Sequence, residues 1–358
     1  MDLTSLREEI DRTDDQILEL LNHRARLVAQ VADLKERMQV PFYVPSRERQ
    51  ITDRLMGVNA GPFPSEAIRP VFQEIFSACL SLEKTVRVAY LGPEATFTHM
   101  AVKRQFGLSA RTVPVGTIAG VFEEVVRGGA DFGVVPVENS TEGVVNHTLD
   151  TFLTSELKIS AEIVLEVTQC LLVRPGMELA QVERVYSHPQ ALAQCRAWLA
   201  SNLPRASLVE ASSTSEAARL ARDDARGAAV ASELAAKLYD LQVTRRNIAD
   251  TAQNVTRFLV VGAVQAEPTG RDKTTLLFEL GNEPGILFRA LQPFAERGVN
   301  MSKIESRPSR RRPWEYVFFI DVDGHQRDAA VAAAIEEVAR SCTSLKVLGS
   351  YPHAEHAE

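Results

Sequence analysis

A long, uninterrupted helical repeat near the N-terminus constrains this chain more than any other feature of its sequence. Between residues 3 and 38, apolar side chains recur three and four positions apart, and no glycine or proline appears before Pro41. This spacing predicts a single helix of about 35 residues, about 50 Å long. The apolar positions are Leu3, Leu6, Ile10, Ile17, Leu20, Leu27, Val31, Leu34 and Met38.

Two further helices are predicted after the first, over residues 46–56 and 65–84, joined by the glycine- and proline-containing segment 57–64. A helix about 50 Å long cannot bury its apolar stripe against so little chain. Pairing of two copies through that stripe would cover it. We therefore expect residues 1–84 to form an all-α module that dimerises.

Three basic residues lie on or beside this apolar seam. Arg24 stands where a leucine would otherwise fit, and Lys35 lies three turns further on the same face, about 16 Å along the axis. Arg24 is either a structural arginine paired to a carboxylate or part of a site for a small dianion. Arg7 lies about 42 Å from Lys35, so it reaches the same ligand only from an antiparallel partner. If all three bind one substrate, the module is an intertwined dimer.

Beyond residue 84, short strands alternate with helices, which indicates an α/β fold, here two lobes with a cleft. The predicted strands cover residues 86–91, 131–137, 163–173, 184–187, 228–231 and 257–264. The predicted helices cover residues 97–106, 117–127, 189–200 and 214–222.

The C-terminal part follows a linker at residues 265–272 and has its own order of elements. Strands and helices occur as strand, helix, strand, strand, helix, strand, which is the ferredoxin-like βαββαβ arrangement. The ranges are 273–280, 285–297, 299–307, 314–323, 328–340 and 345–351.

Composition narrows the class of function. The chain has 358 residues and a formal net charge of −7, which disfavours nucleic acid or an anionic membrane as a partner. Its four cysteines form no CxxC pair, so neither a disulfide framework nor a zinc site is expected. The N-terminal segment lacks the apolar core of a signal peptide, and the longest apolar run, 258–264, is too short to span a membrane. We expect a cytoplasmic protein without a metal or other cofactor.

Four segments of the α/β region are dense in turn residues and polar side chains, and each adjoins a predicted strand. Strand ends are where open α/β sheets bind their ligands. Taken singly, each has a structural explanation: residues 139–143 read as a capped turn, and His188 before Pro189 reads as a helix start. The segments are GPEATFTH (92–99), PVENSTEG (136–143), SHPQALAQC (187–195) and NVTRF (254–258).

In this order, the four segments are similar to the prephenate dehydratase family, over roughly residues 85–263. The resemblance implies that Thr256 donates the proton that lets the hydroxyl of prephenate leave. It places Glu138 near that hydroxyl. Arg257 either binds a carboxylate or is structural. The residues implied to hold the substrate are Asn139, Gln190, Ser213 and Thr214.

The helical module resembles the all-helical chorismate mutase family over residues 3–84. The resemblance is carried by LREEID (6–11), Arg24, Lys35, RER (47–49) and Glu83. It implies that Arg7 of one chain, with Arg24 and Arg47 of the other, holds the two carboxylates of chorismate. Lys35 and Glu83 would hydrogen-bond the ether oxygen whose bond breaks, in a rearrangement that needs no cofactor. Val44 stands where many members of the family have Asp.

The C-terminal segments NEPGIL (282–287) and ESRP (305–308) resemble the phenylalanine-binding ACT domain. Gly285 lies at a helix start, where backbone N–H groups favour a carboxylate, although a simple Pro/Gly cap would look the same. The residues implied to bind phenylalanine are Asn282, Gly285, Ile286, Leu287, Glu305, Ser306, Arg307 and Pro308.

Together the resemblances imply a bifunctional enzyme that converts chorismate to prephenate and prephenate to phenylpyruvate, with phenylalanine as its inhibitor. Its domains would cover residues 1–84, 85–264 and 271–351, in a homodimer or higher homo-oligomer. A fused dehydrogenase would need a GxGxxG motif after a strand, which the chain lacks. Two alternatives stay open: an arogenate dehydratase, and an amino-acid-sensing protein without catalysis.

Overall fold

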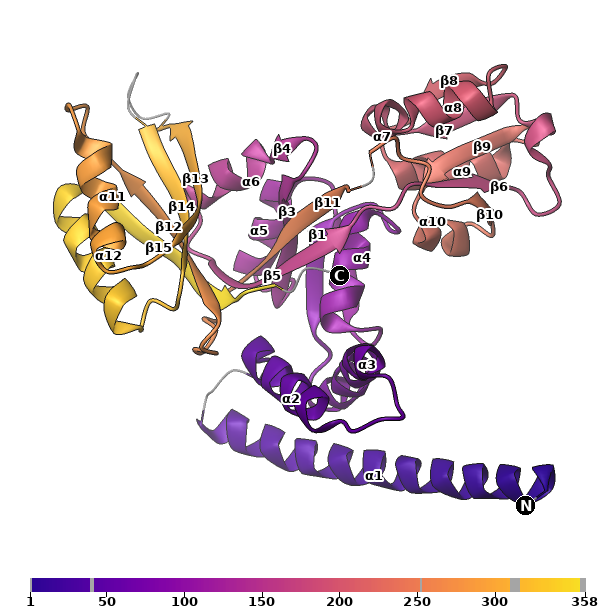
Figure 1. The fold of residues 1–358 in the computed structure, drawn as a ribbon, viewed down its shortest axis with the longest axis horizontal. Coiled ribbons are helices and arrows are strands. Elements are labelled where there is room, and N and C mark those ends of the chain that lie inside the picture. Colours follow the sequence, from indigo (N-terminus) through magenta and orange to yellow (C-terminus); the bar gives the residue numbers. More distant parts are fainter. Residues whose placement is uncertain (1, 39–41, 252, 310–315, 355–358) are drawn as a thin grey trace. The chain divides into compact units, whose positions relative to one another are not determined.

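The structure is a computed structural model that describes all residues except 1, 39–41, 252, 310–315 and 355–358. The chain divides into two compact units (Figure 1). The first comprises Met1–Arg87 and Lys103–Arg111, and the second comprises Val88–Val102 and Thr112–Glu358. None of the described helices is long and apolar enough to cross a membrane. Within the described ranges, no three His, Cys, Asp or Glu residues gather as a metal site.

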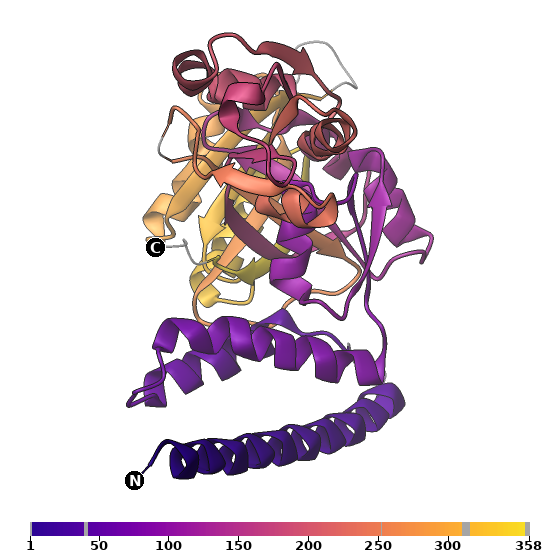
Figure 2. The same ribbon diagram turned by 90° about the vertical axis from the view of Figure 1, so that its right-hand side faces the viewer.

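The first unit is built on the helices α1 (Leu3–Met38), α2 (Pro45–Val58) and α3 (Ser65–Glu83). Figure 2 shows α1 as one continuous helix, which confirms the prediction made from its unbroken repeat. It contacts α3, and one stripe of α1 is half-buried. This stripe consists of Leu21, Arg24, Ala25, Val28, Ala32 and Lys35.

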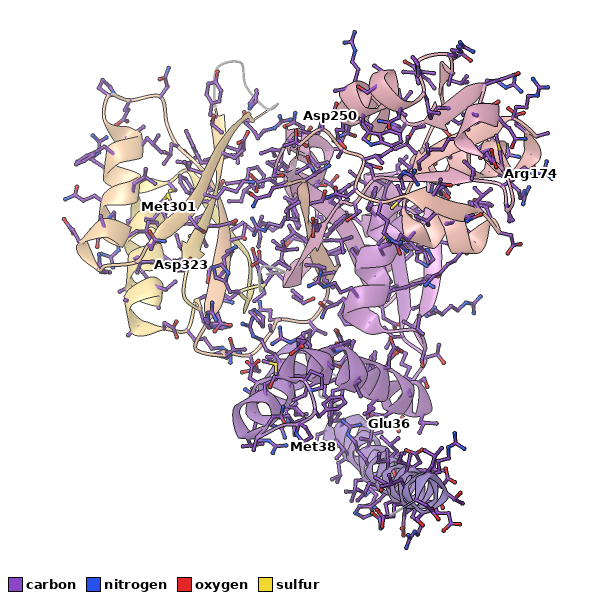
Figure 3. All side chains as sticks on the ribbon, turned by 45° about the vertical axis from the view of Figure 1, so that its right-hand side comes forward. Glu36, Met38, Arg174, Asp250, Met301 and Asp323 are labelled. Carbon is purple, nitrogen blue, oxygen red and sulfur yellow. The ribbon has the colours of Figure 1, made fainter. Side chains whose placement is uncertain are left out.

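The apolar seam of α1 runs beside this stripe and meets it at Arg24, and the apolar side chains of the seam are exposed. Leu20 is 67% exposed, Met38 69% and Ile10 59%, and none of the described residues of α1 is buried. Side chains stand out around α1 along its length, with Glu36 and Met38 near its C-terminal end (Figure 3). The chain's own helices therefore leave the predicted docking stripe uncovered.

The described residues of the second unit form three sheets. The first has the order β2-β1-β3-β11-β5, with β4 paired to β3. Its strands are β1 (Arg87–Leu91), β2 (Arg111–Val115), β3 (Phe132–Asn139), β4 (Gly143–Val144), β5 (Lys158–Glu166) and β11 (Val255–Gly262). The accompanying helices are α4 (Phe97–Phe106), α5 (Ile118–Val126) and α6 (Asn146–Phe152).

The second sheet has the order β10-β6-β9-β7-β8. Its strands are β6 (Cys170–Val173), β7 (Arg184–Ser187), β8 (Ser207–Glu210), β9 (Gly227–Ala231) and β10 (Gln242–Arg245). The helices beside it are η1 (Leu179–Gln181), α7 (Pro189–Gln194), α8 (Arg196–Asn202), α9 (Thr214–Asp223) and α10 (Glu233–Leu238).

Two predicted elements of these sheets are wrong in extent. The strand expected over 163–173 is two strands, β5 and β6, which belong to different sheets. The crossing between the sheets is only Val167, Thr168 and Gln169, and with no glycine or proline this short polar interruption does not mark the end of a strand. The helix expected over 189–200 is likewise divided into α7 and α8 at Cys195. The short elements β2, β4, β8, β10, α6 and α10 were not anticipated, because they carry too few residues for a periodic signal.

The third sheet confirms the predicted βαββαβ order, with strands arranged β13-β14-β12-β15. Its strands are β12 (Asp272–Glu279), β13 (Met301–Pro308), β14 (Tyr316–Asp323) and β15 (Ser344–Pro352), and its helices are α11 (Ile286–Glu296) and α12 (Ala329–Ser341). Both helices lie on one side of the sheet (Figure 1). The predicted start of β14 at Trp314 lies outside the described residues.

Side chains alternate between the two faces of this third sheet, and both faces are buried along β12. Leu276 and Phe278 pack under α11 and α12. Leu277 and Phe319 point the other way and share a core with the first sheet. There β15 approaches β5 so closely that a Cβ at Gly349 would lie 2.2 Å from the Ile159 carbonyl oxygen. Only glycine fits this position.

Candidate functional sites

Thr256 and Asn139 face each other across neighbouring strands. β11 runs antiparallel to β3, and the register pairs these two residues. Asn139 Nδ2 donates to Thr256 Oγ1 over 2.8 Å, and Thr256 is 9% exposed. The Asn139 oxygen accepts the backbone N–H groups of Thr141 and Glu142, each at 3.0 Å. Asn139 therefore caps the predicted turn and also contacts the predicted acid.

Two residues that sequence reasoning did not single out extend this contact. Asn254 Oδ1 lies 2.7 Å from Asn139 Nδ2, and Asn254 Nδ2 donates to Gln194 Oε1 over 3.0 Å. Gln194 belongs to the segment 187–195 and Asn254 to the segment 254–258. Their place in these polar strand-end segments is the only indication of function that the sequence offered for them. Their partners are far away in the sequence, and no local pattern indicates them.

The other predicted substrate-binding residues lie at the ends of parallel strands of the second sheet. Gln190 is exposed in the first turn of α7, which follows β7. Ser213 caps α9, which follows β8, and Thr214 is its first residue. β7 and β8 are parallel, so both helix starts lie at the same edge of the sheet. Neither helix start hydrogen-bonds Thr256 within the described part of the chain.

Glu138 and Arg257 lie on the opposite face of β3 and β11 from Asn139 and Thr256, because neighbouring side chains on a strand alternate. Glu138 Oε2 is 2.6 Å from Lys303 Nζ of β13. The structure therefore does not bring Glu138 to the Thr256 hydroxyl, and its predicted place near the leaving group gains no support.

Arg257 belongs to a buried ion-pair cluster. Its guanidinium donates to Glu162 at 2.7 Å, to Asp321 at 2.6 Å and to the Tyr351 hydroxyl at 2.9 Å. Burial acts to raise the pKa of Asp321, but the charge of Arg257 and the Thr275 hydroxyl hold that pKa below its usual value. Of the two readings of Arg257, the geometry favours the structural one.

In the helical unit, three predicted residues come together. Lys35 Nζ lies 3.9 Å from Glu83 Oε2, and Arg24 stacks on the Phe76 ring at 5.0 Å. Arg24 Nη1 and Glu83 Oε2 are buried, and neither has a hydrogen-bond partner among the residues that the structure describes. Orphaned buried polar atoms are costly, so two of them beside a lysine are typical of a polar ligand site.

Glu48 of α2 joins this cluster and was missed at the sequence level. Burial raises its pKa to about 8, against a hydrogen bond from Gln73 and the positive charges of Arg24 and Lys35. Burial also raises the pKa of Glu83, although the same two cations act in the opposite direction. Glu48 directly follows Arg47 in the quoted segment 47–49, which was the available signal.

Two predicted residues lie apart from this cluster within one chain. Arg7 is exposed near the start of α1, about 42 Å along the helix from Lys35. Arg47 is exposed and approaches Gln50 at 3.5 Å. Their roles stay predictions.

The two segments predicted to bind phenylalanine lie at the same end of the third sheet. Val317 of β14 pairs with Glu279 on one side and with Arg307 on the other, so the loop after β12 meets the end of β13. Gly285 has φ +75° at the start of α11, a conformation that favours glycine. Ser306 and Pro308 are exposed, whereas Arg307 pairs with Asp150 of α6 at 2.8 Å.

Comparison with known families matches three consecutive parts of the chain. Residues 6–84 match chorismate mutase type II, residues 88–266 match prephenate dehydratase, and residues 274–340 match the ACT domain. The prephenate dehydratase of Arthrobacter aurescens, whose structure was solved in complex with L-Phe, is 40% identical to this chain. The TM-score is 0.70, and the match covers 75% of this chain and 90% of that one.

Relatives with all three parts are similar over their whole length. The bifunctional chorismate mutase/prephenate dehydratase of Aquifex aeolicus is 50% identical over 357 residues, which is 99% of this chain and 98% of the relative. The Pseudomonas aeruginosa enzyme of the same description is 43% identical over 357 residues, 98% of either chain. The chain therefore belongs to the bifunctional chorismate mutase/prephenate dehydratases, enzymes of phenylalanine biosynthesis with a C-terminal ACT domain.

Proposed function

We propose that Thr256 is the acid of the dehydratase reaction, acting on prephenate bound beside Asn139. The observation that carries this assignment is the 2.8 Å hydrogen bond from Asn139 Nδ2 to Thr256 Oγ1. A free threonine hydroxyl is a very weak acid. A donor on its oxygen stabilises the negative charge that develops as the proton leaves, and so strengthens the acid.

The reaction needs one proton and no cofactor. As the ring carboxylate of prephenate departs as CO2, the electrons of its C–C bond enter the ring. The ring becomes aromatic when the C–O bond to the hydroxyl breaks, and the departing oxygen takes the Thr256 proton to leave as water. Thr256 then regains a proton from solvent. Gln190, Ser213 and Thr214, at the edge of the second sheet, hold the substrate in this proposal.

For the mutase, we assign Arg24 and Arg47 to the carboxylates of chorismate, and Lys35 and Glu83 to the ether oxygen. Support comes from the orphaned Arg24 Nη1 and Glu83 Oε2. A Claisen rearrangement requires a folded substrate and donors where the ether oxygen gains charge. The raised pKa of Glu83 suits a protonated carboxyl that donates. Glu48, neutral below about pH 8, is a second donor in the cluster.

A second copy of the chain completes the mutase site in this proposal. Arg7 reaches the ligand only from an antiparallel α1, and the exposed seam supplies the surface for that pairing. Leu20, 67% exposed, and Leu34, 55% exposed, belong to a stripe far longer than a lone soluble helix leaves open. A homodimer or larger homo-oligomer in the cytoplasm is part of this assignment.

Phenylalanine is the proposed regulator, bound where the loop 282–287 meets the segment 305–308. Its carboxylate suits the backbone N–H groups at the start of α11, and its ring suits the apolar side chains of Ile286 and Leu287. The relative from Arthrobacter aurescens binds L-Phe. Phe288, 70% exposed, and Ile304, 44% exposed, support a contact between paired ACT domains around this site.

The acid assignment is tested with Thr256→Val, which keeps the shape and removes the proton donor. Phenylpyruvate formation from prephenate should fall by about 10²-fold or more, the usual contribution of a positioned acid. Thr256→Ser is the matched control and should keep a substantial part of the turnover. Chorismate consumption should be unchanged in both variants. Full dehydratase turnover in Thr256→Val would refute the assignment, and equal loss of both activities would indicate misfolding.

Substrate preference is tested on the same samples. The alternative of arogenate as the dehydratase substrate differs by an amine in place of a ketone. Prephenate and arogenate should be offered side by side, with turnover followed for each. We expect prephenate to be preferred, and a higher kcat/KM for arogenate would replace this part of the proposal.

A further inference from the structure

A row of side-chain amides connects the active-site strands of the first sheet to the second sheet. Asn254 lies where the chain crosses from the second sheet into β11, and it is 4% exposed. Its oxygen is 2.7 Å from Asn139 Nδ2, and its Nδ2 is 3.0 Å from Gln194 Oε1. The same Gln194 oxygen accepts from Gln169 Nε2 at 3.3 Å, at the other crossing between the sheets.

The direction of each hydrogen bond in this row is determined by groups at its two ends. Backbone N–H groups only donate, so the Asn139 oxygen must face those of Thr141 and Glu142. The Asn139 NH2 group is thereby turned toward Asn254. At the other end, the Glu142 carboxylate only accepts, and it lies 3.4 Å from Gln194 Nε2. The Gln194 oxygen is thereby turned toward the Asn254 NH2 group.

We propose that Asn254 is a positioning residue of the dehydratase, which holds the Asn139 amide in the orientation that donates to Thr256. Both hydrogens of the Asn139 NH2 group are then used, one on Thr256 Oγ1 and one on Asn254 Oδ1. Thr256 is an acceptor in this contact, so its own proton points elsewhere. No hydrogen bond among the described residues takes that proton, which leaves it for the departing hydroxyl of the substrate.

Asn254 also makes this orientation depend on the second sheet. Gln194 lies one turn after Gln190 on α7, and residues four apart share a helix face. The proposed acid is therefore correctly oriented when α7, which carries a proposed substrate contact, is in place. This inference rests on the proposed role of Thr256.

Asn254→Asp provides a readout that a purely structural role would not produce. When the introduced carboxyl is protonated, it has one carbonyl acceptor and one hydroxyl donor, so it can take both hydrogen bonds of the asparagine and preserve the row. When it is ionised, it has no donor for Gln194 Oε1, and it places a negative charge beside the acid. The kcat of this variant, relative to the wild type, should therefore rise about tenfold or more as the pH is lowered through the pKa of the new carboxyl.

Other ionisable groups near Asn254 are common to the wild type and the variant. They are Glu142 after β3, Glu166 at the end of β5, His188 at the start of α7 and Asp250 on the crossing. Of these, Figure 3 labels Asp250. A change of kcat with pH that only Asn254→Asp shows is therefore caused by titration of the introduced carboxyl. Gln253→Glu is the matched control, because it makes the same chemical change at the exposed neighbouring residue. It should follow the wild-type profile.

Asn254→Ala gives the second measurement, on the full-length enzyme with prephenate as substrate. Its kcat should fall about 10- to 100-fold, with a smaller change in KM, because the acid is misplaced while the substrate contacts remain. Mutase activity should be unchanged in every variant, because its proposed residues lie in the other unit.

The outcomes separate this inference from the acid assignment. A pH profile of Asn254→Asp parallel to the wild type, at whatever level, overturns the positioning role. If Thr256→Val is inactive and Asn254→Ala keeps its kcat, the acid assignment stands and the positioning role is wrong. If Thr256→Val remains active, the acid assignment itself is wrong, and the inference that rests on it is withdrawn as well.

Discussion

The guanidinium of Arg257, one residue beyond Thr256, lies 2.6 Å from the carboxylate of Asp321 in the ACT domain. Glu138, one residue before Asn139, makes a contact of the same length with Lys303. Each of the two strands therefore carries a proposed active-site residue on one face and an ion pair to the ACT sheet on the other. The ACT sheet is thus joined by ion pairs to both strands that hold Thr256 and Asn139.

Asp321→Asn should destabilise the dehydratase and ACT domains together. It removes one partner of a buried guanidinium, while Glu162 remains. We expect a loss of about 3 kcal/mol in the free energy of unfolding, at the lower end for a broken buried pair. Urea unfolding followed by circular dichroism measures it. The control is Glu267→Gln in the exposed pair with Arg327, expected to cost less than about 1 kcal/mol. Equal costs for the two variants would contradict the buried role.

Mixing Arg7→Ala with Arg24→Ala protein should restore mutase activity. Each variant alone is expected to be inactive, because every site of its dimer lacks one arginine. After chain exchange, a heterodimer has one site that lacks both arginines and one that retains both. Chorismate consumption measures the recovery, and native mass spectrometry confirms the heterodimers. The shared-site proposal fails if confirmed heterodimers stay inactive.

Mutase activity should decline at alkaline pH. Because burial raises the pKa of Glu48 to about 8, its carboxyl is protonated below that pH and loses its proton above it. A site that needs the neutral carboxyl then loses about tenfold in rate per pH unit above the pKa. Glu48→Gln should shift the decline to higher pH, whereas the exposed Glu66→Gln should not. A wild-type profile that is flat into the alkaline range would argue against both carboxyls as donors.

Phenylalanine inhibition should weaken in Gly285→Ala. Gly285 has φ +75°, and an alanine there would distort the start of α11 and its N–H groups. Gly281→Ala in the same loop is the control, because a Cβ there meets no atom within 4 Å. The inhibition constant and calorimetric binding of phenylalanine measure the difference. If both variants are inhibited equally, the phenylalanine site lies elsewhere.

Point substitutions are a better test of the ACT domain than its deletion. Leu277 and Phe319 of the ACT sheet share a core with Leu259 and Ile159 of the dehydratase sheet. Removing the ACT domain would expose that core to water, so loss of inhibition could not be separated from loss of fold.

Thermodynamic linkage between the phenylalanine site and the dehydratase site provides a second test of phenylalanine as the regulator. If phenylalanine shifts the dehydratase toward one state, a substrate analogue must weaken phenylalanine binding by the same factor. Titration of phenylalanine with and without the analogue measures that factor. The same affinity in both titrations would mean that the two sites are not coupled.

The sequence by itself determined the three-part organisation. The unbroken repeat of α1 requires one long helix, and the alternation of strands with helices requires α/β sheets, because period and breakers act locally. The βαββαβ order of the last part follows in the same way. The motif positions of Thr256 and Asn139 were also available from sequence, through resemblance to a family.

Only the tertiary structure decided which side chains meet. Asn139 and Asn254 are 115 residues apart, and Arg257 reaches Asp321 over 64 residues. A local pattern cannot show such partners, because the register between strands and the face on which a side chain lies arise when distant segments pair. The same reason explains why the run 163–173 looked like one strand. Its residues are equally apolar on both sides of the crossing, and only the packing of two separate sheets divides them.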